Sequence, residues 1–316
     1  MWYESEAPSN IALIKYMGKI DQAGNKPTNS SLSYTLDHLK TFVRIRLNNN
    51  LTQDHWAPYI RNDLKPIELS VMGKEKFLNH FKMLKSEFQL LGFYNIESAN
   101  NFSSDCGLAS SASSFAALTK ATYSMANKNL IFTNFELSKL SRKGSGSSCR
   151  SFFSPWAIWK NDEAEPIDLP FGNLFHLVVL CDESVKSVSS SEAHKRVLTS
   201  DLFIGRPERA ETRFKNIIEN LQSKNWKNCF KICWNEFWDM HTLFHTSDPA
   251  FIYINASAQK ALNDCLLFWN QQQDGPIVTM DAGSNIHLLF RDNQLDLINF
   301  YKNYFSANHK IWFKDN

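Results

Sequence analysis

A run of small residues from Gly107 to Ser114, Gly-Leu-Ala-Ser-Ser-Ala-Ser-Ser, constrains this chain more than any other segment. The stretch 115–121 that follows has the composition of a buried helix. Only small side chains let a backbone approach a polyphosphate closely, and the amides and dipole of a helix start attract anions. The run therefore predicts a phosphate-binding loop that leads into a helix. The alternative is a tightly packed helix start whose serines act only as caps.

The composition is that of an ordinary soluble protein, since 43% of the 316 residues are hydrophobic and 21% are charged. Such a length can hold two domains. The net charge of +2 argues against a general nucleic-acid binder. The N-terminus contains Glu4 and Glu6 and no apolar core, and no apolar run approaches the roughly 20 residues that span a bilayer. We therefore expect a cytoplasmic protein with no nucleic-acid or membrane partner.

Six cysteines are spread along the chain. Because no signal peptide is predicted, we expect reduced thiols rather than disulfides. Cys229 and Cys233 are spaced to share one face of a helix, and His241 and His245 follow at the same spacing, which leaves a metal site open as an alternative. The aromatic residues around them favour a simpler interpretation, in which both cysteines are core residues of an amphipathic helix.

The periodicity of apolar residues predicts both strands and helices. Strands are predicted at 41–47, 67–71, 175–181, 277–280 and 286–290. One helix is predicted to end at Gly92, because apolar residues recur at helical spacing at Phe77, Phe81, Leu84, Phe88 and Leu91. A capping box of Thr133 and Glu136 predicts the start of a second helix. Further helices are predicted within 212–274 and at 295–304.

The order of these elements favours an α+β fold over a doubly wound sheet, because strands and helices do not alternate strictly. Pro166, Pro170 and Gly172 punctuate the best candidate for a domain boundary. We therefore expect an N-terminal domain of residues 1–171 with the phosphate-binding loop, and a C-terminal α+β domain of residues 172–316.

Three further segments carry polar chemistry. Lys15 and Lys19 lie in a strand-like apolar segment at 7–19, and the ammonium group of lysine can bind a phosphate or carboxylate. The alternative is that both lysines are exposed and only flank a strand. Residues 141–151 combine two glycines, several hydroxyls and three cations, which indicates an anion-binding nest; the alternative is a flexible surface loop. Asp281 ends a predicted strand, where a carboxylate can reach into a cleft, although aspartate often only starts a turn.

Six motifs follow one another along nearly the whole chain, at 7–19, 29–36, 107–112, 141–151, 186–190 and 281–285. In this order they resemble the motifs of the mevalonate diphosphate decarboxylases, a family of the GHMP kinase superfamily. Lys-Tyr-x-Gly-Lys at 15–19 and Gly-Ser-Gly-Ser-x-Cys-Arg at 144–150 are specific to the decarboxylases within it. The resemblance implies a two-domain GHMP-kinase fold, with a cleft between an N-terminal α/β domain and a C-terminal ferredoxin-like α+β domain.

The resemblance also implies a reaction, the ATP-dependent conversion of mevalonate 5-diphosphate to isopentenyl diphosphate, ADP, phosphate and carbon dioxide. ATP phosphorylates the 3-hydroxyl, and the departing phosphate then leaves positive charge that loss of carbon dioxide quenches. The catalytic residues implied are Asp281, which orients or deprotonates the 3-hydroxyl, and Lys15, which stabilises developing charge. Mg2+ is expected to arrive with ATP, with Ser111 as its candidate contact, rather than at a metal site of the protein. The family suggests a homodimer.

The binding residues follow from the same resemblance. The ATP phosphates are expected to contact Gly107, Leu108, Ala109, Ser110 and Ser111. The substrate is expected to contact Asn10, Tyr16, Met17, Gly18, Lys19, Lys76, Ser145, Gly146, Ser147, Ser148, Cys149, Arg150, Ser190 and Ser191.

Some positions depart from the family pattern. Met17 stands where the family has Trp, Ser114 where it has a smaller residue, and Ser284 where it has Pro. After Ser190 the sequence Ser-Glu-Ala-His at 191–194 replaces the usual continuation through Gly-Met, and the segment is one residue short. The resemblance therefore does not predict which contacts this loop makes with the substrate. The alternatives are a mevalonate or phosphomevalonate kinase or decarboxylase of the same superfamily, and a catalytically inactive paralogue.

Overall fold

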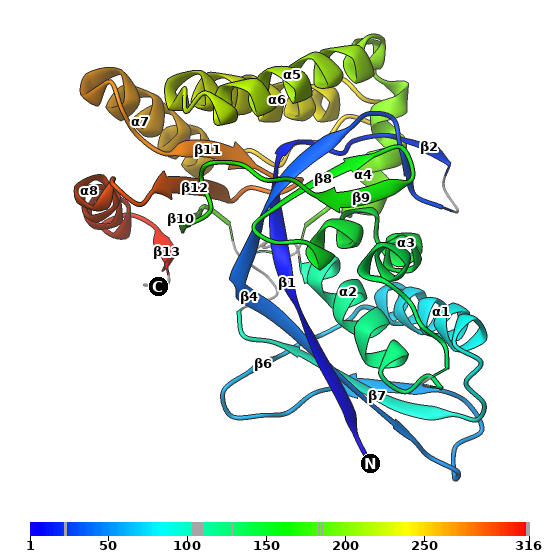
Figure 1. Ribbon diagram of the computed structural model, residues 1–316. Helices are drawn as coiled ribbons and strands as arrows, with labels where there is room; N and C mark the ends of the chain where they lie inside the picture. The colour runs from blue at the N-terminus through cyan, green and yellow to red at the C-terminus, as the bar shows by residue number, and fades with distance from the viewer. Residues whose placement is uncertain (22–23, 103–109, 128, 183, 185, 314–316) are drawn as a thin grey trace.

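The computed structural model describes residues 1–316 except 22–23, 103–109, 128, 183, 185 and 314–316. Two mixed layers of sheet and helix lie side by side, with the N-terminus at the far end of the first sheet and the C-terminus beside the second (Figure 1). The predicted α+β class is confirmed. No helix within the described ranges carries an apolar stretch that could cross a bilayer.

The first sheet is built around two long strands. β1 (Tyr3–Ile14) and β4 (Ser31–Leu47) pair antiparallel, and the alternation predicted at 41–47 is the end of β4. The sheet has seven strands in the order β5-β7-β4-β8-β9, with β1 paired to β4 and β6 paired to β7. Its other strands are β5 (His55–Pro58), β6 (Lys65–Pro66), β7 (Tyr94–Asn100), β8 (Trp156–Lys160) and β9 (Glu163–Pro166). A separate small ribbon joins β2 (Lys19–Asp21) to β3 (Lys26–Pro27).

Three helices pack together beside this sheet (Figure 1). The predicted capping box is confirmed, because the side chains of Thr133 and Glu136 each bond the other residue's backbone amide. The helices are α1 (Val71–Glu87), α2 (Ser110–Tyr123) and α3 (Asn134–Gly144), and a 3-10 helix at Gly146–Phe152 follows α3.

Two local predictions in this half are wrong. No strand forms at 67–71, because the Ser70 side chain accepts a hydrogen bond from the Gly73 amide and starts α1 at Val71. The predicted helix stops before Gly92. Its C-cap is Phe88, and the left-handed backbone of Gln89 (φ 56°) ends the helical path.

The second sheet has four antiparallel strands in the order β11-β12-β10-β13. Three of its strands confirm predictions: β10 (Leu174–Leu180), β11 (Ile277–Met280) and β12 (Ile286–Arg291). The fourth, β13 (Lys310–Phe313), has no predicted counterpart. The helices of this half are α4 (Ser190–Arg196), α5 (Arg206–Gln222), α6 (Trp226–His245), α7 (Ala256–Gln272) and α8 (Leu295–Ser306).

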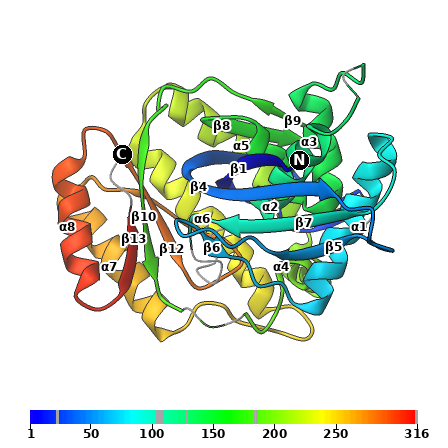
Figure 2. The same cartoon turned by 90° about the horizontal axis from the view of Figure 1, so that it is seen from below.

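The two halves share one hydrophobic core. A single cluster of buried side chains includes Ile14 of β1, Trp156 of β8, Leu177 of β10 and Phe237 of α6. Figure 2 shows the strands of the second sheet beside the ends of the long strands β1 and β4 of the first. Cys229 and Cys233 belong to this core, and the five described cysteines are free thiols. The shared core holds the ends of β1 and β11 beside each other, and the site is built there.

Candidate functional site

A cleft of about 500 Å3 lies where the two halves meet, and we call it the central cleft. That volume lies in the range of small-molecule sites. Fifteen of the predicted site residues line it: Asn10, Lys15, Tyr16, Met17, Lys19, Lys76, Ser110, Ser111, Ser145, Gly146, Ser147, Arg150, Ser190, Ser191 and Asp281. The structure therefore brings residues from both ends of the chain into one site.

Lys15 and Asp281 face each other across the junction of the halves. Lys15 directly follows β1 and Asp281 directly follows β11, and Thr279 Oγ1 bonds the Ala12 carbonyl (3.3 Å) to hold these strands together. Lys15 Nζ lies 2.8 Å from Asp281 Oδ1, and the Lys15 side chain is only 2% exposed. The central cleft thus contains an ion pair between a buried lysine and a half-buried carboxylate.

The charge state of Asp281 follows from its neighbours. Burial by itself would raise the pKa of this carboxyl group. The positive charge of Lys15, the nearby His287, the hydrogen bond from Lys15 and the charge of Lys186 outweigh that effect, so the pKa lies below its ordinary value. Asp281 is therefore an ionised carboxylate at neutral pH, able to accept a proton or orient a hydroxyl.

A buried ionic network supports Lys15 from behind. Glu236 of α6 is fully buried and accepts a hydrogen bond from the Lys15 backbone amide (2.9 Å). The guanidinium of Arg206, also fully buried, donates to Glu236 Oε2 (3.0 Å) and Asp239 Oδ2 (3.3 Å), and Arg213 donates to Glu236 Oε2 (3.0 Å). Sequence reasoning missed this network. The sequence feature that could have revealed the network is Glu236 on the apolar face of α6, because burying an unpaired charge there would be costly.

Arg150 lies in the wall of the central cleft. Its guanidinium donates to Asn10 Oδ1 (3.3 Å) and to Ser31 Oγ (2.9 Å), and burial lowers its pKa. Asn10 is fixed in turn, because its amide donates to the Ser151 hydroxyl (2.8 Å) and to the Ser147 carbonyl (3.1 Å). No carboxylate pairs with Arg150 in the described part of the chain. A buried cation with only neutral partners is suited to an anionic ligand.

The charge of the cleft wall is strongly one-sided. Among the described lining residues, Asp281 is the one carboxylate, whereas Lys15, Lys19, Lys76, Arg150 and Lys186 are cations. Burial lowers the pKa of Lys19 to about 8, with Lys76 and Lys195 adding to the effect, and burial also lowers the pKa of Lys76. Concentrated positive charge in a concave, partly desolvated site favours a polyanionic ligand.

Three predicted contact residues lie behind the cleft wall rather than along it: Gly18, Ser148 and Cys149. Ser148 Oγ is bonded to Ser141 Oγ (2.7 Å) and the Ser145 carbonyl (2.6 Å), and the Cys149 thiol to the Gly146 carbonyl (3.1 Å). In a 3-10 helix residues three apart align, so Ser147 and Arg150 share the cleft face, whereas Ser148 and Cys149 between them turn inward.

Gly18 has a structural role of its own. Its φ of +89° is in the left-handed region, and a Cβ there would lie 2.6 Å from the Phe203 ring. Its amide donates to His194 Nδ1 (3.1 Å), which brings His194 into the cleft wall. His194, Lys186, Ser189, Asn25 and Met240 line the cleft without having been predicted.

The start of α2 also faces the central cleft. Ser110 and Ser111 line it, and the hydroxyls of Ser111 and Ser145 are 3.5 Å apart. Ser113, by contrast, is buried against Thr41 and bonds the Ser110 carbonyl, so it packs the helix start. The predicted phosphate-contacting residues Gly107, Leu108 and Ala109 lie outside the described residues.

Comparison with known proteins accounts for the whole chain. A family model for the diphosphomevalonate decarboxylase-like N-terminal domain matches residues 7–168, and one for the mevalonate 5-diphosphate decarboxylase C-terminal domain matches residues 176–315. The diphosphomevalonate decarboxylase of Debaryomyces hansenii is 30% identical over 95% of this chain and 82% of its own.

Solved structures agree with this assignment. A mevalonate diphosphate decarboxylase from Legionella pneumophila is 43% identical with a TM-score of 0.92, covering 99% of this chain and 100% of that one. A complex of MDDEF with MVAPP, AMPPCP and magnesium is 29% identical with a TM-score of 0.84, covering 99% and 96%. The likeness confirms the expected GHMP-kinase fold. This chain belongs to the diphosphomevalonate decarboxylase family.

Proposed function

We propose that this protein converts mevalonate 5-diphosphate and ATP to isopentenyl diphosphate, ADP, phosphate and carbon dioxide in the mevalonate pathway. One observation carries the proposal: among the described residues that line the cleft, one ionised carboxylate, Asp281, stands with five cations, and such a cleft suits two polyanions. The complex of MDDEF with MVAPP, AMPPCP and magnesium supports ATP and Mg2+ as the co-substrate and its ion.

The residues of the central cleft suggest how the reaction proceeds. Asp281 accepts the proton of the 3-hydroxyl while the oxygen of that hydroxyl attacks the γ-phosphoryl group of ATP. Lys15 neutralises the negative charge that develops nearby. The carbon–oxygen bond to that phosphate then breaks. The electrons of the carbon–carboxylate bond form the new double bond, carbon dioxide leaves, and the departing phosphate can take the proton back from Asp281.

The cations divide between the two substrates. We expect Arg150 and Lys19, with the hydroxyls of Ser145 and Ser147, to hold the substrate's anionic groups, since all four line the cleft. We expect the α2 start at Ser110 and Ser111 to receive the ATP phosphates, since helix N-termini favour anions. No cluster of three acidic, histidine or cysteine ligands occurs in the described ranges. Serine hydroxyls fit Mg2+ that is carried by ATP, where it would neutralise phosphate charge.

Three broader features of the protein are also proposals: the domain boundary, a homodimer and a cytoplasmic location. The family models end at 168 and begin again at 176, which supports a domain boundary between residues 171 and 172. A homodimer rests on the family resemblance alone, and a cytoplasmic location rests on the sequence of the N-terminus and the lack of a long apolar run.

Product analysis with ATP and each of three acceptors tests the proposed substrate. Isopentenyl diphosphate is expected from mevalonate 5-diphosphate, and no decarboxylation from mevalonate or its 5-phosphate, because the cations of the cleft must be matched by a diphosphate. Decarboxylation of the monophosphate at an equal rate would contradict this, and would favour a monophosphate decarboxylase. Phosphorylated mevalonate as the only product would favour a kinase.

Substitution Arg150→Lys is expected to raise KM for mevalonate 5-diphosphate about ten- to a hundredfold. Lysine keeps the charge but loses the planar fork, so hydrogen bonds to the anion and to Asn10 and Ser31 are lost. Steady-state kinetics measure this, with Arg46→Lys on the outer end of β4 as a matched control. An unchanged KM for Arg150→Lys would remove Arg150 from the substrate site.

The affinity for substrate is expected to fall as the pH rises from about 7 to about 9. Lys19 has a pKa of about 8, so its ammonium is charged below that pH and becomes neutral above it. KM for mevalonate 5-diphosphate should therefore increase across this window, whereas kcat should change less. Lys19→Arg keeps its charge throughout and should flatten the increase. The same slope in both proteins would show that another group titrates.

A further inference from the structure

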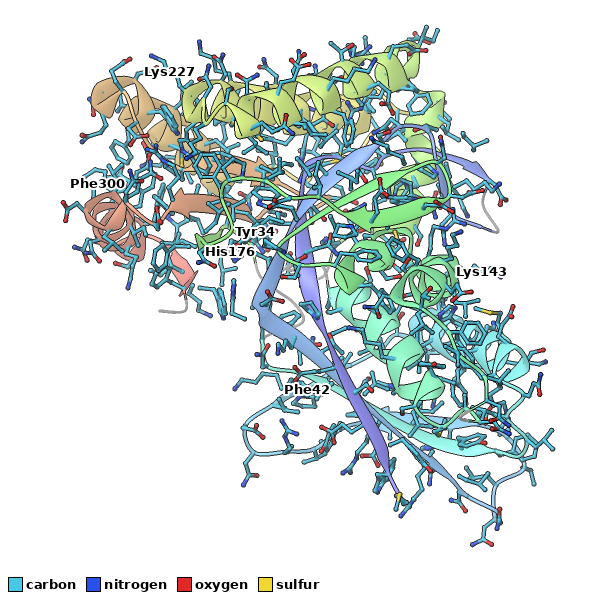
Figure 3. The ribbon with its side chains drawn as sticks, in the orientation of Figure 1. Tyr34, Phe42, Lys143, His176, Lys227 and Phe300 are labelled. Carbon is cyan, nitrogen blue, oxygen red and sulfur yellow. The ribbon has the colours of Figure 1, made fainter. Side chains whose placement is uncertain are left out.

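Three histidines form a hydrogen-bonded chain between the halves of the protein. His38 belongs to β4, His176 to β10 and His287 to β12. His38 Nε2 lies 3.2 Å from His176 Nδ1, and His176 Nε2 lies 3.0 Å from His287 Nδ1. Trp312 stacks on the outer ring, that of His38, with ring centroids 5.1 Å apart. Figure 3 shows His176 beside Tyr34, where the two sheets meet.

The inner end of this chain reaches the proposed catalytic carboxylate. His287 and Asp281 line the same small cavity of about 20 Å3, together with Asp182, Lys186 and Asn285. The cavity adjoins the central cleft, because Asp281 and Lys186 line both. Such a volume holds one water molecule. Because His176 occupies Nδ1 of His287, the nitrogen left for that cavity is Nε2.

His176 and His287 are neutral. Burial lowers the pKa of His176 well below its ordinary value, and the neighbouring His287 and His38 add to the effect. Burial lowers the pKa of His287 to about 4; Asp281 opposes this shift, whereas Lys15 and Lys186 reinforce it. Among the described residues, the charged groups near His287 also include Asp182, whose carboxylate lines the same cavity.

The two neutral imidazoles allow only two proton arrangements. Each of them carries one proton, and each contact needs one donor and one acceptor. Either His176 and His287 are both protonated on Nε2, so that the chain donates toward Asp281, or both are protonated on Nδ1, so that it donates away. An ionised carboxylate at the inner end can only accept. It therefore selects the Nε2 form, as a hydrogen bond on one nitrogen sets the tautomer of the other.

We propose that His38, His176 and His287 form a positioning chain that presents the Nε2–H of His287 to Asp281 through one water molecule and so holds the carboxylate ionised. This inference rests on the proposed role of Asp281 as the acceptor of the 3-hydroxyl proton. The chain binds no substrate. It acts by fixing which nitrogen of His287 carries the proton. Because His38 and His176 belong to different sheets, the tautomer of His287 depends on the contact between the two sheets.

NMR of the imidazole nitrogens in the intact protein tests the chain directly. Near neutral pH, His176 and His287 are expected to be protonated on Nε2 and unprotonated on Nδ1, with their signals assigned from His176→Gln and His287→Gln. A proton on Nδ1 of either ring, or a charged imidazolium, would overturn the proposal. This measurement does not depend on enzymatic activity, whereas the kinetics of Asp281→Asn test the proposed function. A failure of the positioning chain can therefore be distinguished from a failure of the proposed function.

Kinetics of paired variants test what the chain does. In His287→Leu the donor to the cavity is lost, which raises the pKa of Asp281. The acid limb of the kcat profile should therefore move to higher pH, with KM nearly unchanged and kcat near neutrality changed much less, because Lys15 still pairs with Asp281. In His287→Gln, whose amide can donate from a similar position, the acid limb should return toward its original pH.

His176→Phe provides the second arm of the kinetic test. This substitution keeps a ring at the position but removes the donor to His287 Nδ1, so the tautomer of His287 is no longer fixed. The acid limb should shift in the same direction as in His287→Leu, and the nitrogen spectrum of His287 should show the Nδ1 proton in part. An acid limb unmoved in both variants would overturn the proposal, and the spectra of the unaltered protein decide the matter where a variant does not fold.

Discussion

Asp281→Asn is expected to lower turnover by about two orders of magnitude or more, the scale of general base catalysis. Asparagine keeps the shape of the side chain but carries no negative charge and cannot accept the 3-hydroxyl proton. KM for both substrates should change little, because the carboxylate acts mainly in the transition state. Steady-state rates of ADP and carbon dioxide formation measure this.

The control for this variant is Asp292→Asn, an exposed aspartate directly after β12. It should behave as the unaltered protein does. Because Asp281→Asn leaves the buried Lys15 without its partner, thermal unfolding must show that the variant is folded. A folded Asp281→Asn protein with a near-normal rate would move the catalytic role to another residue.

Lys15→Met should produce a loss of similar size, about two orders of magnitude in kcat, through missing charge stabilisation. Lys15 is also the first of the groups that lower the pKa of Asp281. Without it that pKa rises, so part of the lost rate should return as the pH is raised. The acid limb of the rate profile should therefore lie at higher pH in Lys15→Met than in the unaltered protein.

The double variant of Lys15 and Asp281 provides the check. If both residues serve one step, the loss in the double variant should be much smaller than the product of the single losses. Fully multiplicative losses would show that the residues act in separate steps, and the 2.8 Å ion pair would then have no catalytic meaning.

The parts of the site that could be predicted are those encoded in short segments. Asp281 follows an apolar strand and precedes a turn of small residues, and the structure places it in the cleft accordingly. The capping box at Thr133 and Glu136 was likewise predictable, because both partners lie within one turn. The other residues that line the cleft were predicted from the family motifs, because the local sequence pattern alone did not decide between a binding site and an exposed segment.

The parts that could not be predicted depend on contacts between distant segments. Glu236 supports Lys15 across 221 residues of sequence, and no local pattern joins them. His176 and His287 stand in strands that sequence analysis identified, yet only the pairing of β10 with β12 reveals that their rings meet. The inward turn of Ser148 and Cys149 depends on the 3-10 geometry after α3, which the glycines of this segment did not indicate.

The fate of the 3-hydroxyl oxygen tests the central claim most directly. Mevalonate 5-diphosphate labelled with heavy oxygen at the 3-hydroxyl is converted with ATP, and the released phosphate and water are analysed by mass spectrometry. If the hydroxyl is phosphorylated in the cleft of Asp281 and Lys15 before carbon dioxide leaves, the label must appear in the inorganic phosphate. Label in water, with unlabelled phosphate, would contradict the account.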